Sequence, residues 1–257
     1  SHLENIDSDN IIQTVNLNYT APLLLNSIFI KQTEDWKINR SITGEGVRQT
    51  LAELKDIIPS LKINSVPSGT SVFDWAIPKE WKVRDAYIIA PNGKKLCQFS
   101  ENNLHLLGYS IPFKGKVSFA ELKEHLYTLP EQPNAIPYIT SYYKERWGFC
   151  LTHEQFESLD DGDYEVFIDC ELFNGEMNYG ELLIKGESEK EIFLSTYICH
   201  PSMANNELSG ILASIYLSCV SLNSFSILSI LAPGQHGQIS HHFLCECPFL
   251  PSSVKLK

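Results

Sequence analysis

A histidine and a glutamate seven residues apart are the side chains in this sequence best suited to metal chemistry. His200 ends an apolar run that begins at Ile192, and Glu207 precedes a second apolar segment. The pattern predicts a buried strand, a loop and then the N-terminus of a helix. In open α/β sheets, ligands bind at this position, beyond the carboxyl ends of the strands. An imidazole and a carboxylate that meet there are two of the ligand types that zinc accepts.

Each of these residues also has a purely structural interpretation. A histidine at a strand end is often satisfied by local hydrogen bonds, and for His200 taken alone this interpretation is favoured. Glu207 would be stabilised by the dipole of the following helix, and Asn205 or Asn206 would cap that helix. A catalytic zinc ion takes three protein ligands, and this loop offers one or two. The other ligands and a general base must therefore come from further along the chain.

The C-terminal region holds a second group of residues of metal-binding type. Its members are His236, His241, His242, Cys245, Glu246 and Cys247. Dense His/Cys tracts can bind metal, but this spacing matches no established ligand pattern, so a metal site at these residues is not favoured. The sequence has no G-x-S-x-G motif and no phosphate-binding glycine loop.

The composition limits the class of protein. The chain has 257 residues, is 43% hydrophobic and carries a net charge of −11, which fits a globular domain with a sizeable core and argues against nucleic-acid binding. Seven cysteines without a C-x-x-C pair indicate reduced thiols. No basic segment followed by an apolar one begins the chain, so no signal peptide is visible. We therefore expect a cytoplasmic protein.

One long uncharged segment needs a separate explanation. Residues 211–232 carry no charge and are long enough to cross a bilayer. Six serines and Asn223 dilute the segment, and its pattern divides into a helix to about Val220 and a strand from about Phe225 to Leu231. We therefore expect no membrane span.

The elements that must position the site follow from local patterns. Thr43 is the expected N-cap of a helix with apolar residues at helical spacing that ends at Pro59. A strand follows over residues 61–66. The Pro91-Asn92-Gly93 sequence predicts a hairpin turn, and residues 104–109 read as another strand.

Two further helix starts and a pair of strands are predicted downstream. Ser118 and Thr152 each begin a capping-box pattern. Residues 164–173 alternate between apolar and polar, as a half-buried strand does. Asn174-Gly175 predicts a turn, after which residues 177–184 would run back as the partner strand.

Five segments of the chain resemble a known family. They look like bacterial aminopeptidase-like proteins of unknown function, which are similar to zinc exopeptidases of the leucyl aminopeptidase and glutamate carboxypeptidase type. Genes of this family often lie beside surface-polysaccharide biosynthesis genes. The resemblance covers roughly residues 36–222, and the matching segments are residues 39–48, 66–75, 103–110, 147–151 and 199–210.

The resemblance implies an α/β fold with a three-layer αβα exopeptidase core. That core would comprise residues 36–69 and 116–257, atypical after residue 222, with a small β-rich domain inserted at residues 70–115. Residues 1–35 form a weakly patterned N-terminal segment. Full-length relatives carry a winged helix at the C-terminus, so we expect the chain as written to be truncated and its core incomplete.

The resemblance also implies a zinc site with one or two ions. His200 would be the first ligand. The family's bridging aspartate corresponds to Asn206, so either Glu207 takes the ligand role or a single zinc binds. The family's general-base glutamate and later ligands have no counterpart in residues 233–239.

Two functions remain open at this point. The expected activity is zinc-dependent aminopeptidase-like hydrolysis of a small peptide or an aminoacyl substrate, and the alternative is a non-catalytic binding or scaffolding member of the same fold. The identity of the substrate and the oligomeric state are not determined by the sequence.

Overall fold

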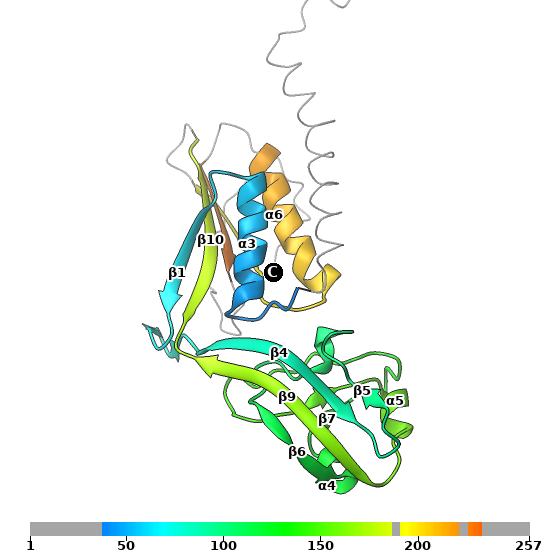
Figure 1. The fold of residues 1–257 in the computed structure, drawn as a ribbon. Coiled ribbons are helices and arrows are strands. Elements are labelled where there is room, and N and C mark those ends of the chain that lie inside the picture. The colour runs from blue at the N-terminus through cyan, green and yellow to red at the C-terminus, as the bar shows by residue number, and fades with distance from the viewer. Residues whose placement is uncertain (1–37, 187–190, 221–225, 233–257) are drawn as a thin grey trace, which may run out of the picture.

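The computed structural model describes residues 38–186, 191–220 and 226–232. These residues form two units, a core unit with a four-stranded sheet and two helices, and an inserted domain built around a second sheet (Figure 1). The inserted domain comprises residues 80–173. From residue 38 the described chain runs through the core unit, passes through the inserted domain, and returns to the core unit.

The core sheet has the strand order β1-β10-β12-β11. Its elements are α3 (Glu45–Ile57), β1 (Lys62–Pro67), β10 (Glu176–Ile184), β11 (Glu191–Tyr197), the π-helical turn η3 (Ala204–Leu208), α6 (Ser209–Val220) and β12 (Ser226–Ala232). The β1–β10 and β10–β12 pairs are antiparallel, whereas β11 and β12 are parallel and are joined through α6. The strand–helix–strand unit predicted from the apolar pattern of residues 192–231 is therefore confirmed.

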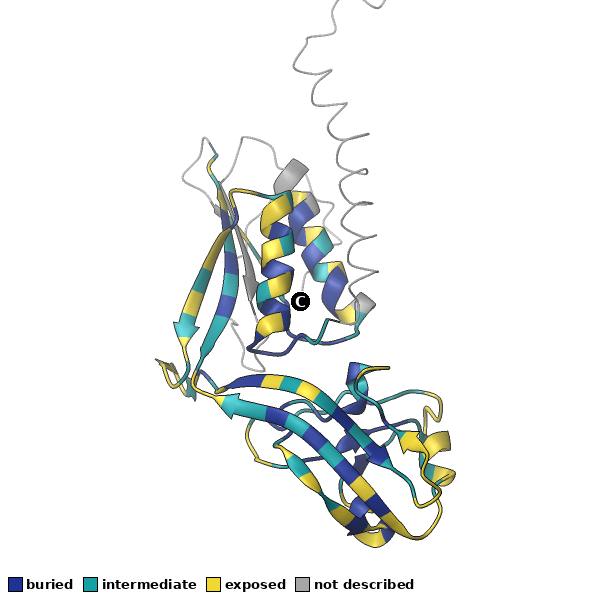
Figure 2. Cartoon of the chain, viewed as in Figure 1, coloured by how far each residue is buried: buried dark blue, intermediate teal, exposed yellow. Residues whose placement is uncertain are grey.

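Both helices pack on the same face of this sheet through one apolar cluster (Figure 2). Its buried members are Val47, Leu51, Leu54, Leu61, Leu182, Ile198, Leu208, Ile211 and Ile215. On the opposite face, Leu183 and Phe193 remain 51% and 47% exposed. The described residues thus supply two of the three layers that an αβα core contains.

The start of α3 differs from the prediction. Gly44, not Thr43, is the N-cap residue, and it has a positive φ of 111° and no side-chain cap. The Thr43 side chain is buried and its hydroxyl instead bonds to the phenol of Tyr109 and the backbone carbonyl of Lys79. The Thr43 hydroxyl therefore makes tertiary hydrogen bonds and does not cap the helix, as local capping rules predict it would.

The inserted domain contains a four-stranded sheet of order β5-β4-β9-β6. Its elements are β4 (Glu80–Ile89), β5 (Lys95–Leu96), the 3₁₀ turn η2 (Asn103–His105), β6 (Phe113–Ser118), α4 (Phe119–Lys123), β7 (Leu126–Tyr127), β8 (Phe149–Cys150), α5 (His153–Glu157) and β9 (Asp163–Phe173). A small hairpin, β2 (Ser71–Val72) and β3 (Trp75–Ala76), precedes it.

Local signals in this domain have mixed outcomes. The β4–β5 hairpin around Gly93 and the N-caps Ser118 and Thr152 are confirmed. The strand predicted over residues 104–109 is wrong, because the Asn102 side chain accepts a bond from the backbone of Leu104 and stabilises a 3₁₀ turn there.

The predicted pairing of residues 164–173 with 177–184 is also wrong. β9 pairs with β4 and β6 in the inserted domain, whereas β10 pairs with β1 and β12 in the core. Asn174-Gly175 is therefore a crossing between two sheets. A Cβ on Gly175 would lie 2.3 Å from a carboxylate oxygen of Glu80, so a glycine is needed where the chain passes this side chain. The crossing extends the inserted domain to residue 173, beyond the expected range of 70–115.

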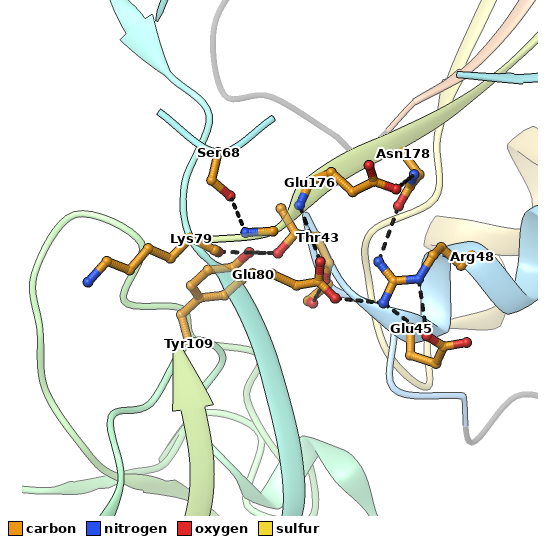
Figure 3. Close-up of polar contacts among 11 residues, drawn as sticks. Thr43, Glu45, Arg48, Ser68, Lys79, Glu80, Tyr109, Glu176 and Asn178 are labelled. Atoms are coloured by element: carbon orange, nitrogen blue, oxygen red, sulfur yellow. Dashed lines mark hydrogen bonds and ion pairs between the residues drawn. The ribbon is translucent and has the colours of Figure 1, made fainter. Parts of the chain in front are cut away.

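Charged side chains connect the two units at this crossing (Figure 3). Arg48 of α3 contacts the nearly buried carboxylate of Glu80 at 2.6 Å and that of Glu45 at 2.9 Å. The other oxygen of Glu80 accepts the backbone N–H of Glu176, and Asn178 accepts a longer bond from Arg48. The network therefore joins α3 of the core to β4, the first strand of the inserted domain, and to β10, the core strand that follows this domain.

Two of the regions discussed from the sequence are not described by the structure, and the membrane-span prediction concerns a third. The His/Cys cluster at residues 236–247 and the N-terminal segment 1–35 lie outside the described residues. Within the described ranges, no helix is long and apolar enough to cross a membrane.

Candidate metal centre

The candidate site lies where β11 ends and the chain turns toward α6. β11 is parallel to β12, so the loop after it lies at the carboxyl end of a parallel strand, as the sequence predicts. The helix approaches the strand very closely here, because a Cβ on Gly210 would lie 2.1 Å from Oγ1 of Thr196. This glycine lets the start of α6 rest on β11 and so brings the preceding turn, with Glu207, back toward His200.

His200 and Glu207 form a direct contact. Nδ1 of His200 lies 2.9 Å from Oε2 of Glu207. The Glu207 side chain is fully buried, and that of His200 is 19% exposed. The second carboxylate oxygen, Oε1, is buried without a hydrogen-bond partner. A buried carboxylate oxygen without a partner is costly, which makes it a candidate metal-binding atom.

The surroundings of Glu207 act on its ionisation in opposite directions. Burial raises the pKa of the carboxyl, while the hydrogen bond from His200 and the positive charge of Arg40 oppose that rise. Arg40 is itself buried, and its Nε donates to Oγ1 of Thr50. A divalent cation at the site would favour the charged carboxylate in the same way, since an adjacent positive charge stabilises the ionised form.

These residues fit a zinc ion by type and spacing. Two ligand atoms about 2.0–2.1 Å from a tetrahedral zinc lie roughly 3.3 Å apart, and the His200–Glu207 contact is 2.9 Å. Metal binding releases the imidazole proton, after which Nδ1 becomes a donor atom beside the carboxylate. Oε1 then provides a further oxygen in a buried position. The pair thus has suitable chemistry for one metal ion.

A third donor group stands beside the pair. Cys199 is buried, and its Sγ lies 3.4 Å from Nδ1 of His200. Ligand atoms of Cys199, His200 and Glu207 all lie within 4.8 Å of one another, and in the described ranges no other group of three His, Cys, Asp or Glu residues meets that criterion. Cys199 is not among the ligands predicted from the sequence, although a cysteine directly before a candidate histidine is a visible signal.

The structure separates the two alternatives for the second position. Asn206 is exposed, whereas its neighbour Glu207 is buried against His200. Consecutive residues of a helical turn point in different directions, so a single one of them can face the histidine. The structure brings together His200 and Glu207 and leaves Asn206 at the surface, and their role as metal ligands remains a prediction.

Comparison with known proteins finds relatives with an aminopeptidase-like domain. A family described as a domain of unknown function, DUF2172, matches residues 80–171, which is nearly the whole inserted domain. A Clostridium acetobutylicum protein is 52% identical over 178 residues, which are 69% of this chain and 41% of that protein. It bears the provisional name polysaccharide biosynthesis protein with aminopeptidase-like domain.

Solved structures agree with this placement. A crystal structure from C. acetobutylicum, provisionally assigned as a peptidase, is 44% identical with a TM-score of 0.75, and the match covers 87% of this chain and 52% of that one. A zinc aminopeptidase from Bacillus subtilis has the same fold at 10% identity, with a TM-score of 0.55 and coverage of 82% and 60%. The resemblance to aminopeptidase-like proteins and the zinc-aminopeptidase fold are thus confirmed. The chain spans about half or less of the length of its two C. acetobutylicum relatives.

Proposed function

We propose that this chain is part of a zinc-dependent, aminopeptidase-like hydrolase and that His200 and Glu207 hold a zinc ion. The observation that carries the proposal is the buried Glu207 carboxylate, which contacts His200 with one oxygen and leaves the other without a partner. The aminopeptidase-like relative and the zinc-aminopeptidase fold support it.

The described residues contribute binding and orientation to such a reaction. A bound zinc ion would polarise a scissile carbonyl and lower the pKa of a water molecule. Before a metal binds, Glu207 holds the His200 ring through Nδ1, and the full burial of Glu207 keeps bulk water away from its carboxylate. The remaining ligands and a general base would come from the part of the complete protein that this chain does not span.

The substrate class and setting are part of the same proposal. A small peptide or an aminoacyl compound with a free amino group would suit an aminopeptidase-like hydrolase. The name of the C. acetobutylicum relative supports a setting in polysaccharide biosynthesis, where amide-linked precursors would be substrates. We further propose that the protein acts in the cytoplasm. We also propose that this chain binds one zinc ion, because exposed Asn206 offers no charged bridge to a second ion.

The test combines zinc content with hydrolysis. The chain is loaded with zinc, dialysed and assayed for metal by elemental analysis, and the complete protein is assayed on leucyl-p-nitroanilide. We expect about one bound zinc ion per chain in the wild type and much less bound zinc in His200→Ala. The matched control is His153→Ala, because His153 also lies near a glutamate, Glu157, at 3.5 Å but far along the chain from the candidate site. Absence of zinc from the loaded wild type would overturn the proposal.

A non-catalytic binding role is the second candidate, and Asn206 is the observation that favours it. The neutral side chain stands where the resemblance implies a bridging aspartate, and it is exposed. A complete protein that retains zinc, but hydrolyses no aminoacyl anilide while binding the corresponding amino acid, would support this role over the enzymatic one.

A further inference from the structure

The His200 ring is enclosed by side chains from both units of the protein. Glu207 contacts Nδ1, and Tyr197 of the core lies edge-on to the ring with centroids 5.0 Å apart at 71°. Tyr138 also lies edge-on to the His200 ring, with centroids 4.9 Å apart and an interplanar angle of 72°. Tyr138 comes from the long segment between β7 and β8 of the inserted domain, so this domain touches the candidate metal ligand directly.

The segment that carries Tyr138 is firmly attached to the rest of its domain. Ser141 bonds through its backbone N–H and its hydroxyl to the carbonyl of Gly108, and the hydroxyl also reaches the carbonyl of Tyr109. The phenol of Tyr138 lies 3.4 Å from that of Tyr142, which packs edge-on against the buried Tyr109 at 4.7 Å. These contacts hold the Tyr138 ring in a defined position.

The inserted domain contacts the same loop a second time. Oγ of Ser202 donates to Oδ1 of Asn103 at 2.7 Å, and Ser202 has a positive φ of 49°, a conformation that is rare for a serine. The seam between the units beside Tyr138 and Pro201 holds a cavity of only about 10 Å³, room for roughly one water molecule. The loop that carries His200 is therefore held on two sides by the inserted domain.

We infer that Tyr138 is a positioning residue for the proposed metal ligand His200, and that the inserted domain orients this ligand from outside the core. This inference rests on the proposed function, since it concerns the affinity for zinc. Hydrogen-bond partners of a metal-binding histidine fix its orientation, and their loss weakens metal binding about 10- to 100-fold. An aromatic edge contact is a weaker restraint, so the lower end of this range is expected for Tyr138. A ring held by aromatic edges on two sides loses that restraint when one edge is removed.

The experiment measures the zinc affinity of the whole chain by competition with a chromophoric chelator, using Zn²⁺ alone as the probe. Tyr138→Ala should weaken binding about tenfold, which equals about 1.4 kcal/mol. Tyr138→Phe keeps the ring and should stay within about threefold of the wild type. Tyr143→Ala is the matched control, because Tyr143 is 79% exposed and should bind zinc as the wild type does.

A second readout in zinc-free protein separates this inference from the proposed function. The ¹⁵N resonances of the His200 imidazole should shift in Tyr138→Ala and stay in place in Tyr143→Ala. If the wild type binds no zinc, the proposed function fails, while these resonances still decide whether Tyr138 holds the ring. Equal zinc affinity and unchanged His200 resonances in a folded Tyr138→Ala protein would overturn the inference, as would equal losses in the Ala and Phe variants.

Discussion

The ion pair between Arg48 and Glu80 should stabilise the junction between the core and the inserted domain far more than a surface pair does. The Glu80 side chain is 6% exposed and that of Arg48 is 31% exposed. Breaking a fully buried pair by removing one partner costs about 3–5 kcal/mol. Partial exposure of Arg48 lowers this, so Glu80→Gln should cost about 2–3 kcal/mol of unfolding free energy.

A double-mutant cycle isolates the interaction from the other effects of each substitution. Glu80→Gln and Arg48→Met keep the side-chain sizes similar, and we expect a coupling energy of about 2 kcal/mol, within the range for contacting residues. The control cycle uses Arg84→Met and Asp169→Asn, a pair at 2.9 Å whose side chains are both nearly half exposed. Exposed ion pairs are screened by solvent and contribute little, so the control coupling should be clearly smaller than that of Arg48 and Glu80.

Equilibrium unfolding in urea, followed by tryptophan fluorescence, gives the four free energies in each cycle. The urea dependence must stay constant among the variants for the free energies to be comparable. An Arg48–Glu80 coupling no larger than that of the surface pair would refute the reasoning. It would mean that apolar contacts, and not this charge network, hold the two units together.

Two further predictions concern the stability of each unit. Gly46→Ala should lower the free energy of unfolding by about 1–2 kcal/mol despite the better helix propensity of alanine, because the new Cβ would lie 2.3 Å from the Asn39 carbonyl oxygen. Gly115→Ala is the control and should be nearly neutral, since its Cβ meets only a phenylalanine ring at 3.4 Å. Equal urea midpoints for the two variants would contradict this prediction. His105 is buried with Nδ1 on the Cys150 carbonyl, and burial lowers its pKa below the ordinary value. As the pH falls, the unfolded chain therefore binds more protons than the folded chain. The contribution of neutral His105 to the free energy of unfolding is complete above about pH 6.5 and declines below it, by at most about 1.4 kcal/mol per pH unit. His105→Asn should reduce the stability lost between pH 7.5 and 5.5, and an identical loss in both proteins would count against the prediction.

The sequence was informative where structure is set by nearby residues. The apolar run that ends at His200, the loop and the next apolar segment form a strand–loop–helix unit whose pattern is local. The same is true of the N-caps at Ser118 and Thr152, whose bonds reach only three residues along the chain. These features require no knowledge of distant contacts.

Distant contacts account for the failures. Asn174-Gly175 reads the same whether the next strand turns back or crosses to another sheet, and the crossing depends on the side chain of Glu80. Thr43 looks like a helix cap, but its hydroxyl is taken by Tyr109. In each case the deciding partner lies far away in the sequence, so local rules could not identify it.

The candidate site shows the same division. His200 could be found because it ends the apolar run that contains β11 and lies in the loop that follows this strand. The choice between Asn206 and Glu207 could not be made, since it depends on how the π-helical turn η3 directs its side chains. The contact of Tyr138 with His200 joins two units of the protein, and nothing in the sequence around either residue indicates it.

Zinc X-ray absorption spectroscopy on the zinc-loaded chain tests the central claim most directly. The spectrum of the wild type should contain imidazole scattering with a nitrogen at about 2.0–2.1 Å and a carboxylate oxygen at about 2.0–2.2 Å. An added sulfur at about 2.3 Å that disappears in Cys199→Ser would identify Cys199 as the third ligand. His200→Ala should lose the imidazole contribution or the metal itself. A His200→Ala spectrum identical to that of the wild type would contradict the account.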